Sequence, residues 1–164
     1  MPAASKPIDP AAIPNASDAG LEAGADLANG KYLAQFACLE CHTKHTAPGT
    51  PDPLDMANAF GGDEAFPAAA LGLPSPPFPA TIYSANITHA DAGIAGWTVA
   101  QQLNVIQHGK DRNGGNTCPP MPSGPNGAFG KLTDKDALDI ESYIHGVPPV
   151  NNTIDGGSGS CVAP

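Results

Sequence analysis

The sequence is poor in aromatic side chains, in basic side chains and in long apolar runs. Aromatic residues make up 5% of the 164 residues, and seven Lys and Arg stand against sixteen Asp and Glu, a formal net charge of −9. So acidic a chain is disfavoured as a partner for nucleic acid or for an anionic membrane surface. No apolar run of about eighteen residues occurs, so we expect no transmembrane segment in these residues.

Glycine and proline are abundant instead, at nineteen residues each. This composition predicts long loops and a modest amount of regular structure, and the length fits one compact domain. We expect an extended arm over residues 1–17, a single domain over 18–150, and a Gly/Ser-rich tail over 151–164. Because the chain has few large apolar side chains, we expect an apolar cofactor to fill part of its core.

The clearest periodic segments predict three helices. The first begins near Asp18 or Asp26 and runs into the first cysteine pair, with one buried face formed by Leu33, Phe36 and Ala37. The second is expected over 97–108, before Gly109. The third follows the N-cap residue Thr133 and ends before Gly146. Between the first two, frequent prolines exclude a long helix, although a short one is expected over 63–71.

The motif Cys38-Leu39-Glu40-Cys41-His42 carries the strongest chemical signal. Two thiols three positions apart can reach the two vinyl groups of a haem as thioethers, while the adjacent imidazole reaches the iron from the same side. The motif therefore predicts one haem c, bound covalently through Cys38 and Cys41, with His42 as a ligand of the iron. The haem would also serve as the apolar cofactor expected in the core.

The cysteine pair has two other possible interpretations, a zinc site and a thioredoxin-like redox pair. A zinc site needs two further ligands at suitable spacing, and Cys118 and Cys161 do not form a second Cys-x-x-Cys pair. A thioredoxin-like redox pair needs a surrounding strand–helix–strand pattern, which the sequence does not show. Both fit less well than haem attachment.

The second axial ligand of such an iron is best sought in Cys118-Pro119-Pro120-Met121-Pro122. The prolines stiffen the backbone, so that the Met121 thioether can be held against iron with little further loss of entropy. The alternative for Met121 is gap-filling in a core. His108 is the main competitor, and His145 is expected at the surface; the remaining candidates are Met1, Met56, His45 and His89.

Cys118 and Cys161 remain once the haem has taken its pair. In an oxidising compartment two spare cysteines most simply form a disulfide. Closing a loop of about forty residues is worth roughly 3–4 kcal/mol in the loop-entropy treatment. We expect this bond to pin the tail to the segment that contains Met121.

Several separate segments together resemble class I cytochromes c, and in particular the cytochrome domains of bacterial membrane-associated alcohol and gluconate dehydrogenases. The resemblance covers about residues 26–150. Its segments are Tyr32-Leu33-Ala34, the Cys38–Thr43 motif, Ala47-Pro48-Gly49, Ile82-Tyr83-Ser84-Ala85-Asn86-Ile87-Thr88, Gly93-Ile94-Ala95-Gly96-Trp97-Thr98, Pro120-Met121-Pro122 and Lys131-Leu132-Thr133-Asp134.

The resemblance implies an all-α class I cytochrome c fold with long loops, in which the first and last helices cross and Gly30 lies near Tyr143. It implies His42 and Met121 as the axial ligands of the iron. It also implies that Asn86, Ile87, Trp97 and Pro120 line or brace the haem pocket; ordinary core packing is the alternative for Trp97.

The function implied is one-electron transfer with redox protein partners. The alternative is an enzyme or a gas sensor in which Met121 is absent from the iron, but no second catalytic constellation is present. The haem motif suits a periplasmic or otherwise exported protein, yet Met1 to Lys6 lack the apolar core of a secretory signal. We therefore expect that a leader or lipid-anchored stub was removed, or replaced by Met1.

Overall fold

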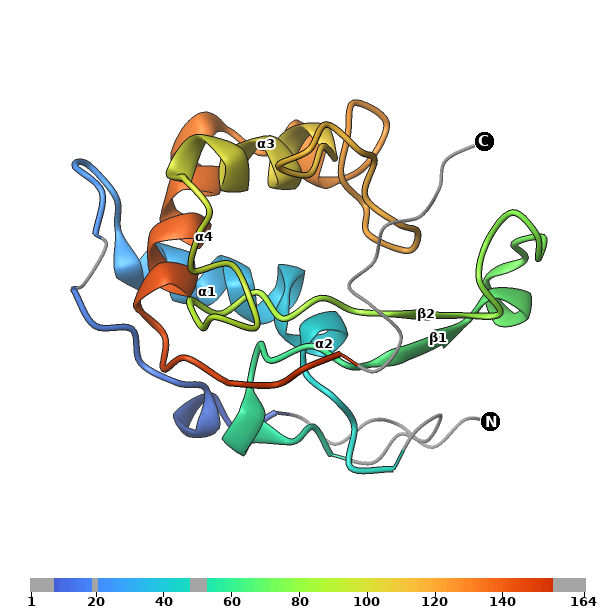
Figure 1. Cartoon of the computed structure of the whole chain (residues 1–164). Coiled ribbons are helices and arrows are strands. Elements are labelled where there is room, and N and C mark those ends of the chain that lie inside the picture. Colours follow the sequence, from blue (N-terminus) through green and yellow to red (C-terminus); the bar gives the residue numbers. More distant parts are fainter. Residues whose placement is uncertain (1–7, 19–20, 48–52, 155–164) are drawn as a thin grey trace.

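Four α-helices and one small antiparallel sheet form the regular structure of the described residues (Figure 1). The computed structural model describes residues 8–18, 21–47 and 53–154. The elements are α1 (Leu27–Ala37), α2 (Leu39–His42), β1 (Ala65–Pro67), β2 (Thr81–Tyr83), α3 (Val99–His108) and α4 (Asp134–Gly146), with short 3₁₀ helices at Pro10–Ala12, Met56–Asn58, Ala68–Leu71 and Phe129–Lys131. The expectation of a purely helical chain is therefore only partly correct.

The three predicted helices are confirmed, and local caps set their starts. Asp26, not Asp18, begins α1, because its carboxylate accepts the backbone N–H groups of Ala28 and Asn29 at 2.9 and 3.1 Å. Thr98 and Gln101 form a capping box at the start of α3, and Gly109 ends that helix at a φ of 65°. Thr133 caps α4 as expected, although this helix includes Gly146.

The predicted buried face of α1 is wrong at Phe36, whose side chain is 70% exposed and lies edge-on to Tyr32. Leu33 and Ala37 do pack against the core. The face of α1 that contacts α4 is centred on Gly30. The two helices are so close there that a Cβ on Gly30 would lie 2.0 Å from the carbonyl oxygen of Asp139. So close an approach of two backbones leaves large side chains such as Phe36 on the outer side of α1. The expected proximity of Gly30 and Tyr143 is confirmed, since the same Cβ would lie 2.8 Å from the Cβ of Tyr143.

The short helix expected over 63–71 is replaced by β1 and a 3₁₀ turn. Phe66 pairs with Ile82 in the ladder between β1 and β2. Just before β1, Asp63 has a φ of 70° and its N–H donates to the carbonyl of Ser84 at 3.0 Å. A left-handed residue at the start of the segment is incompatible with a helix beginning there.

The core lies where α1, α4 and the segment before α1 meet. Its most buried large side chains include Ile13, Leu39, Phe60, Ile140 and Tyr143. The described part of the N-terminal arm packs on α4, because the Tyr143 hydroxyl donates to the carbonyl of Pro14 at 2.6 Å and the N–H of Ser17 donates to that of Gly146 at 2.8 Å. Among the residues described, no helix combines the length and the apolar character needed to cross a membrane.

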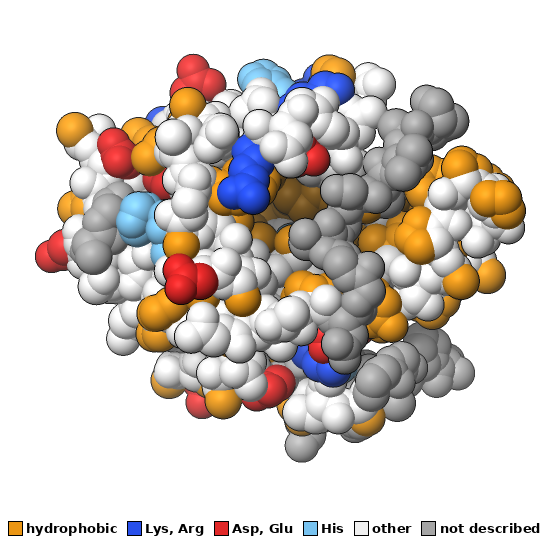
Figure 2. All heavy atoms as spheres, viewed as in Figure 1, with side chains coloured by type: hydrophobic (Ala, Val, Ile, Leu, Met, Phe, Trp, Pro, Cys, Tyr) orange, Lys and Arg blue, Asp and Glu red, His pale blue; other side chains and the backbone are white. Residues whose placement is uncertain are grey.

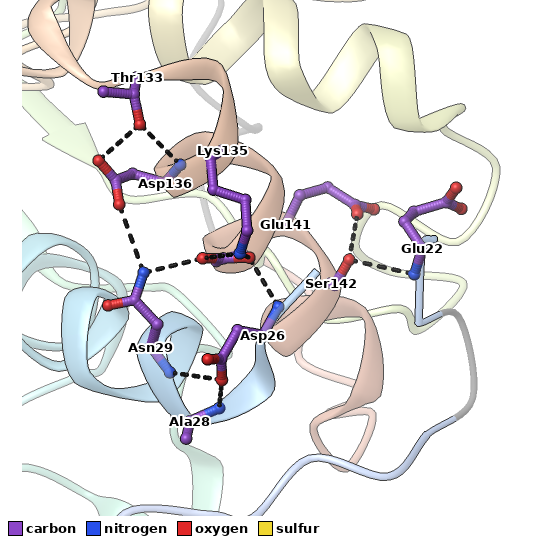
Figure 3. Close-up of polar contacts among 10 residues, drawn as sticks. Glu22, Asp26, Ala28, Asn29, Thr133, Lys135, Asp136, Glu141 and Ser142 are labelled. Atoms are coloured by element: carbon purple, nitrogen blue, oxygen red, sulfur yellow. Dashed lines mark hydrogen bonds and ion pairs between the residues drawn. The ribbon is translucent and has the colours of Figure 1, made fainter. Parts of the chain in front are cut away.

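A buried carboxylate, Asp139, ties α1 to α4 through a polar network (Figure 3). Its oxygens accept the backbone N–H of Asp26 at 2.7 Å, the Asn29 amide at 2.8 Å and the Lys135 ammonium at 2.6 and 2.7 Å. Burial by itself would raise the pKa of Asp139, but these hydrogen bonds and the Lys135 charge outweigh burial, so the pKa lies below its ordinary value. The carboxylate is thus held ionised inside the helix pair.

Replacing Asp139 by Asn should destabilise the protein near neutral pH by about 1.5–3 kcal/mol, because an amide cannot accept all of these hydrogen bonds. The folded-state pKa is depressed, so the stabilisation is present above the unfolded-state pKa of about 4 and is lost as the pH falls through the folded-state value. Denaturant unfolding should therefore show a gap between wild type and Asp139→Asn that narrows below about pH 4. The exposed Asp91, changed to Asn, is the control. A gap that does not depend on pH would contradict this account.

Candidate cofactor site

An apolar cavity of about 330 Å³ opens on the face drawn in Figure 2, where hydrophobic side chains form the base of a hollow. Its walls come from the end of α1 and α2, from β2 and the segment after it, from α3 and the loop that follows, and from α4. The volume is typical of a site for a sizeable organic ligand. All eight cofactor-binding residues predicted from the sequence line it: Cys38, Cys41, His42, Asn86, Ile87, Trp97, Pro120 and Met121.

Cys38 and Cys41 lie together on one wall because α1 ends directly before them. Cys38 is the C-cap of α1 and is buried, whereas Cys41 lies half-buried on the single turn of α2. Both are free thiols in this structure. Burial, together with the neighbouring Cys41, raises the pKa of Cys38 to about 12, and burial also raises the pKa of Cys41. At neutral pH both are therefore uncharged, which suits an apolar wall.

His42 is oriented by a hydrogen bond from its Nδ1 to the carbonyl oxygen of Ala85, at 2.8 Å. A carbonyl oxygen can only accept, so Nδ1 carries the proton and Nε2 keeps its lone pair. Burial lowers the pKa of His42, although the bond to Ala85 partly opposes this effect. A neutral imidazole whose second nitrogen is held by a backbone carbonyl is the usual state of a metal-ligating histidine.

Met121 is the one described candidate for a second iron ligand that lines this cavity. The loop after α3, which contains Met121, and α2, which contains His42, both line the cavity. Met1 lies outside the described residues. The other candidates do not line the cavity: Met56, His45, His89, His108 and His145.

Asn86 braces the cavity wall rather than pointing free polar atoms at a ligand. Its side chain is 3% exposed, and its Nδ2 donates to the carbonyls of Val150 at 2.6 Å and Asn152 at 3.3 Å. Its Oδ1 accepts from the N–H and the hydroxyl of Thr88, at 3.0 and 2.8 Å. The segment that includes Ala85 is thereby fixed to the chain that follows α4.

Trp97 lines the cavity and its side chain is half-buried. The guanidinium carbon of Arg112 lies 5.7 Å from the centre of its ring, within range of a cation–π interaction. Ile87 lines the same cavity and also packs against the core. Both side chains therefore contribute apolar surface to the cavity wall.

The donor set fits haem c better than zinc. An apolar cavity, two thiols, an imidazole with one nitrogen free and a thioether are the groups that a covalently held haem uses. Among the described residues, neither Cys38 nor Cys41 belongs to a group of three or more His, Cys, Asp or Glu side chains that could share a metal ion. Cys161 lies outside the described residues, so its predicted disulfide to Cys118 stays a prediction.

Sequence reasoning missed four residues that contribute to this site. The carbonyl of Ala85 is a backbone group and leaves no signature in the sequence. Ile140 and Ile144 of α4 line the cavity, and their spacing of four was a usable sign of a shared helix face. Glu141 lines it as well, and nothing in its sequence context marks a buried carboxylate.

Comparison with known proteins identifies relatives that share most of this chain. No known family profile matches it. The fructose dehydrogenase cytochrome subunit of Gluconobacter japonicus is 32% identical over 120 residues, which is 72% of this chain and 20% of that protein. The alcohol dehydrogenase (quinone) cytochrome c subunits of Gluconacetobacter polyoxogenes and Komagataeibacter europaeus are each 28% identical over 124 residues, 74% of this chain and 22% of theirs.

The chain thus spans about one fifth of the length of the curated relatives it matches. The similar part is nevertheless nearly three quarters of this chain. By sequence, this chain has a cytochrome c-like relationship to part of the cytochrome subunit of a fructose dehydrogenase and of the cytochrome c subunits of alcohol dehydrogenases.

Proposed function

We propose that this chain is an electron carrier that holds one haem c, attached to Cys38 and Cys41, with His42 and Met121 as the iron ligands. The observation that carries the proposal is the shared cavity. One apolar hollow is lined by both thiols, by an imidazole whose Nε2 is left free, and by the only described candidate thioether at that cavity. The names of the relatives support electron transfer by a cytochrome.

Each residue has a distinct task in this proposal. Cys38 and Cys41 tether the macrocycle, so a loop-rich chain retains a large cofactor. His42 presents Nε2 in a fixed orientation because Ala85 holds Nδ1. The soft sulfur of Met121 favours the ferrous state and raises the reduction potential. When bound, the haem supplies an iron that gains or loses one electron.

The cavity walls keep water from the metal and hold the ligands still. Ile87, Ile140 and Ile144 contribute apolar surface, and exclusion of water favours the less charged ferrous state. Asn86 has its polar atoms occupied by backbone and by Thr88, so the wall that carries Ala85 is fixed. A site that is already rigid needs little rearrangement when the charge of the iron changes.

The fold and the surroundings of the protein form part of the same proposal. The packing of α1 on α4 at Gly30 supports a class I cytochrome c fold over residues 18–150, with its first and last helices crossing over the haem. The arm 1–17 and the tail 151–164 flank that unit in the sequence, and Ile13 of the arm packs into its core. We place the protein in the periplasm or another exported location, where it exchanges electrons with redox proteins, such as a dehydrogenase or a terminal oxidoreductase, and catalyses no reaction of its own.

Covalent attachment predicts that haem stays with the chain after denaturation. Mass spectrometry of the denatured holoprotein should show one haem added to the polypeptide, and a pyridine haemochrome spectrum should report two thioether bonds. Cys38→Ala and Cys41→Ala should each leave one bond, and the double variant should lose its haem on acid–acetone extraction. Haem that is extracted from the wild type would contradict the proposed attachment.

Ligation by Met121 predicts a weak near-infrared sulfur-to-iron band in the ferric wild type. Met121→Leu should abolish the band, lower the reduction potential and allow rapid binding of carbon monoxide to the ferrous form. Met56→Leu is a matched control, because Met56 packs against the core and does not line the cavity. A wild type that is already high-spin, or that binds carbon monoxide rapidly, would favour the enzyme or gas sensor.

We also propose a Cys118–Cys161 disulfide that holds the loop containing Met121. Cys118 lines the cavity close in sequence to Met121, which is where a tether of the tail would steady a ligand. Non-reducing peptide mapping should recover the two cysteines in one cross-linked peptide. Alkylation of both thiols without prior reduction would refute the pairing.

A further inference from the structure

His89, Glu141 and His145 form a second cluster of possible metal ligands, of which Glu141 alone also lines the cofactor cavity. Glu141 and His145 are four residues apart on α4, so they share one face of that helix. His89 reaches the same place from the segment between β2 and α3. One donor atom from each of the three side chains lies within 4.8 Å of the other two.

Two of these donors are buried without a hydrogen-bond partner among the described residues. Glu141 is 1% exposed; its Oε2 accepts the Ser142 hydroxyl at 3.3 Å (Figure 3), but Oε1 accepts nothing. Nδ1 of His145 is likewise unpartnered and lies 3.6 Å from that Oε1. Because a buried polar atom left unpaired destabilises the fold, two such atoms facing each other indicate a missing third group.

A hydrogen bond between Glu141 and His145 does not satisfy these two atoms well. Their separation of 3.6 Å exceeds a normal hydrogen bond. The His89 ring is stacked on the His145 ring at 3.6 Å between centroids, with an interplanar angle of 24°. Burial and the neighbouring His145 both lower the pKa of His89. A pair of stacked imidazoles therefore disfavours the second positive charge and keeps a neutral ring, which is the state that ligates metals.

We propose that His89, Glu141 and His145 bind a divalent transition-metal ion of the zinc class, at a site separate from the haem iron. Two imidazoles and one carboxylate are a common zinc donor set that leaves a position for water. Bond lengths near 2 Å place tetrahedral ligand atoms roughly 3.3 Å apart, close to the observed 3.6 Å for His145 and Glu141. His89 is half-exposed and lies outside any helix, so its ring can rotate to bring the third ligand atom up to the same ion.

Gln102 supplies an outer partner for this site. Its side-chain amide is buried and lies 3.2 Å from Nε2 of His89. An amide offers a donor at one end and an acceptor at the other, so it can support either tautomer of the ring as a metal binds. Such outer hydrogen bonds orient ligating histidines in metal sites.

The test is zinc binding to the full-length holoprotein, freed of any polyhistidine tag. Calorimetric titration with zinc chloride should show one site, which magnesium chloride does not fill because imidazole suits zinc and not magnesium. His89→Ala, Glu141→Gln and His145→Ala should each weaken binding by about 100-fold or more, since loss of an outer partner alone costs 10–100-fold. His108→Ala, at an exposed histidine that does not line the cofactor cavity, should bind zinc as the wild type does.

X-ray absorption at the zinc edge should show two imidazole nitrogens in the wild type. The haem absorption spectrum of each variant checks that the fold is retained, and Glu141→Gln preserves the size of the side chain if an alanine variant fails to fold. Zinc binding that is absent from the wild type, or unchanged in the Glu141→Gln and His145→Ala variants, would overturn the proposal. Neither result bears on haem attachment, which has its own test.

Discussion

The close approach of α1 and α4 at Gly30 is the constraint on which the other elements depend. A side chain at this position would collide with the backbone of Asp139 and with Tyr143, so the absence of one allows the two helices to touch. Because α1 ends directly before Cys38, the contact also fixes where both thiols and His42 lie. In α4, Tyr143 packs in the core, and Ile140 and Ile144 both belong to the core and line the cavity.

The segment from β2 to residue 90 forms the second rigid wall, and its rigidity comes from buried polar groups. Burial alternates along it, with residues 82, 84, 86, 88 and 90 inside and their neighbours half-buried. The buried polar members are paired: the Ser84 hydroxyl accepts the N–H of Glu64, and Asn86 and Thr88 bond to each other and to Val150. Since an unpaired buried group is costly, any shift of this wall would break several bonds. The Ala85 carbonyl that orients His42 is therefore held in one place.

The helix starts and the haem-attachment motif could be predicted from the sequence, because both depend on local chemistry. Helix starts at Asp26 and Thr133 follow from side chains that satisfy nearby N–H groups, and the Cys38–His42 motif needs only its own spacing. The exposed face of α1 could not be foreseen, because the depth of Gly30 in the helix pair depends on α4, more than a hundred residues away. The same holds for His145, expected at the surface but half-buried against His89, and for the sheet formed where a short helix was expected. These outcomes depend on tertiary packing, which overrides local preference.

The cavity accounts for the low content of aromatic side chains. A chain with 5% aromatic residues fills the region around Phe60 and Tyr143, yet leaves apolar side chains from several segments lining a hollow. In water such a hollow forfeits both dispersion contacts and the gain from apolar burial. A large flat apolar cofactor restores both, so under the proposed function its binding free energy is in part folding free energy. Covalent attachment through Cys38 and Cys41 would then do more than retain the cofactor. It would also stabilise the fold, because a chain that lost the cofactor would lose part of its core.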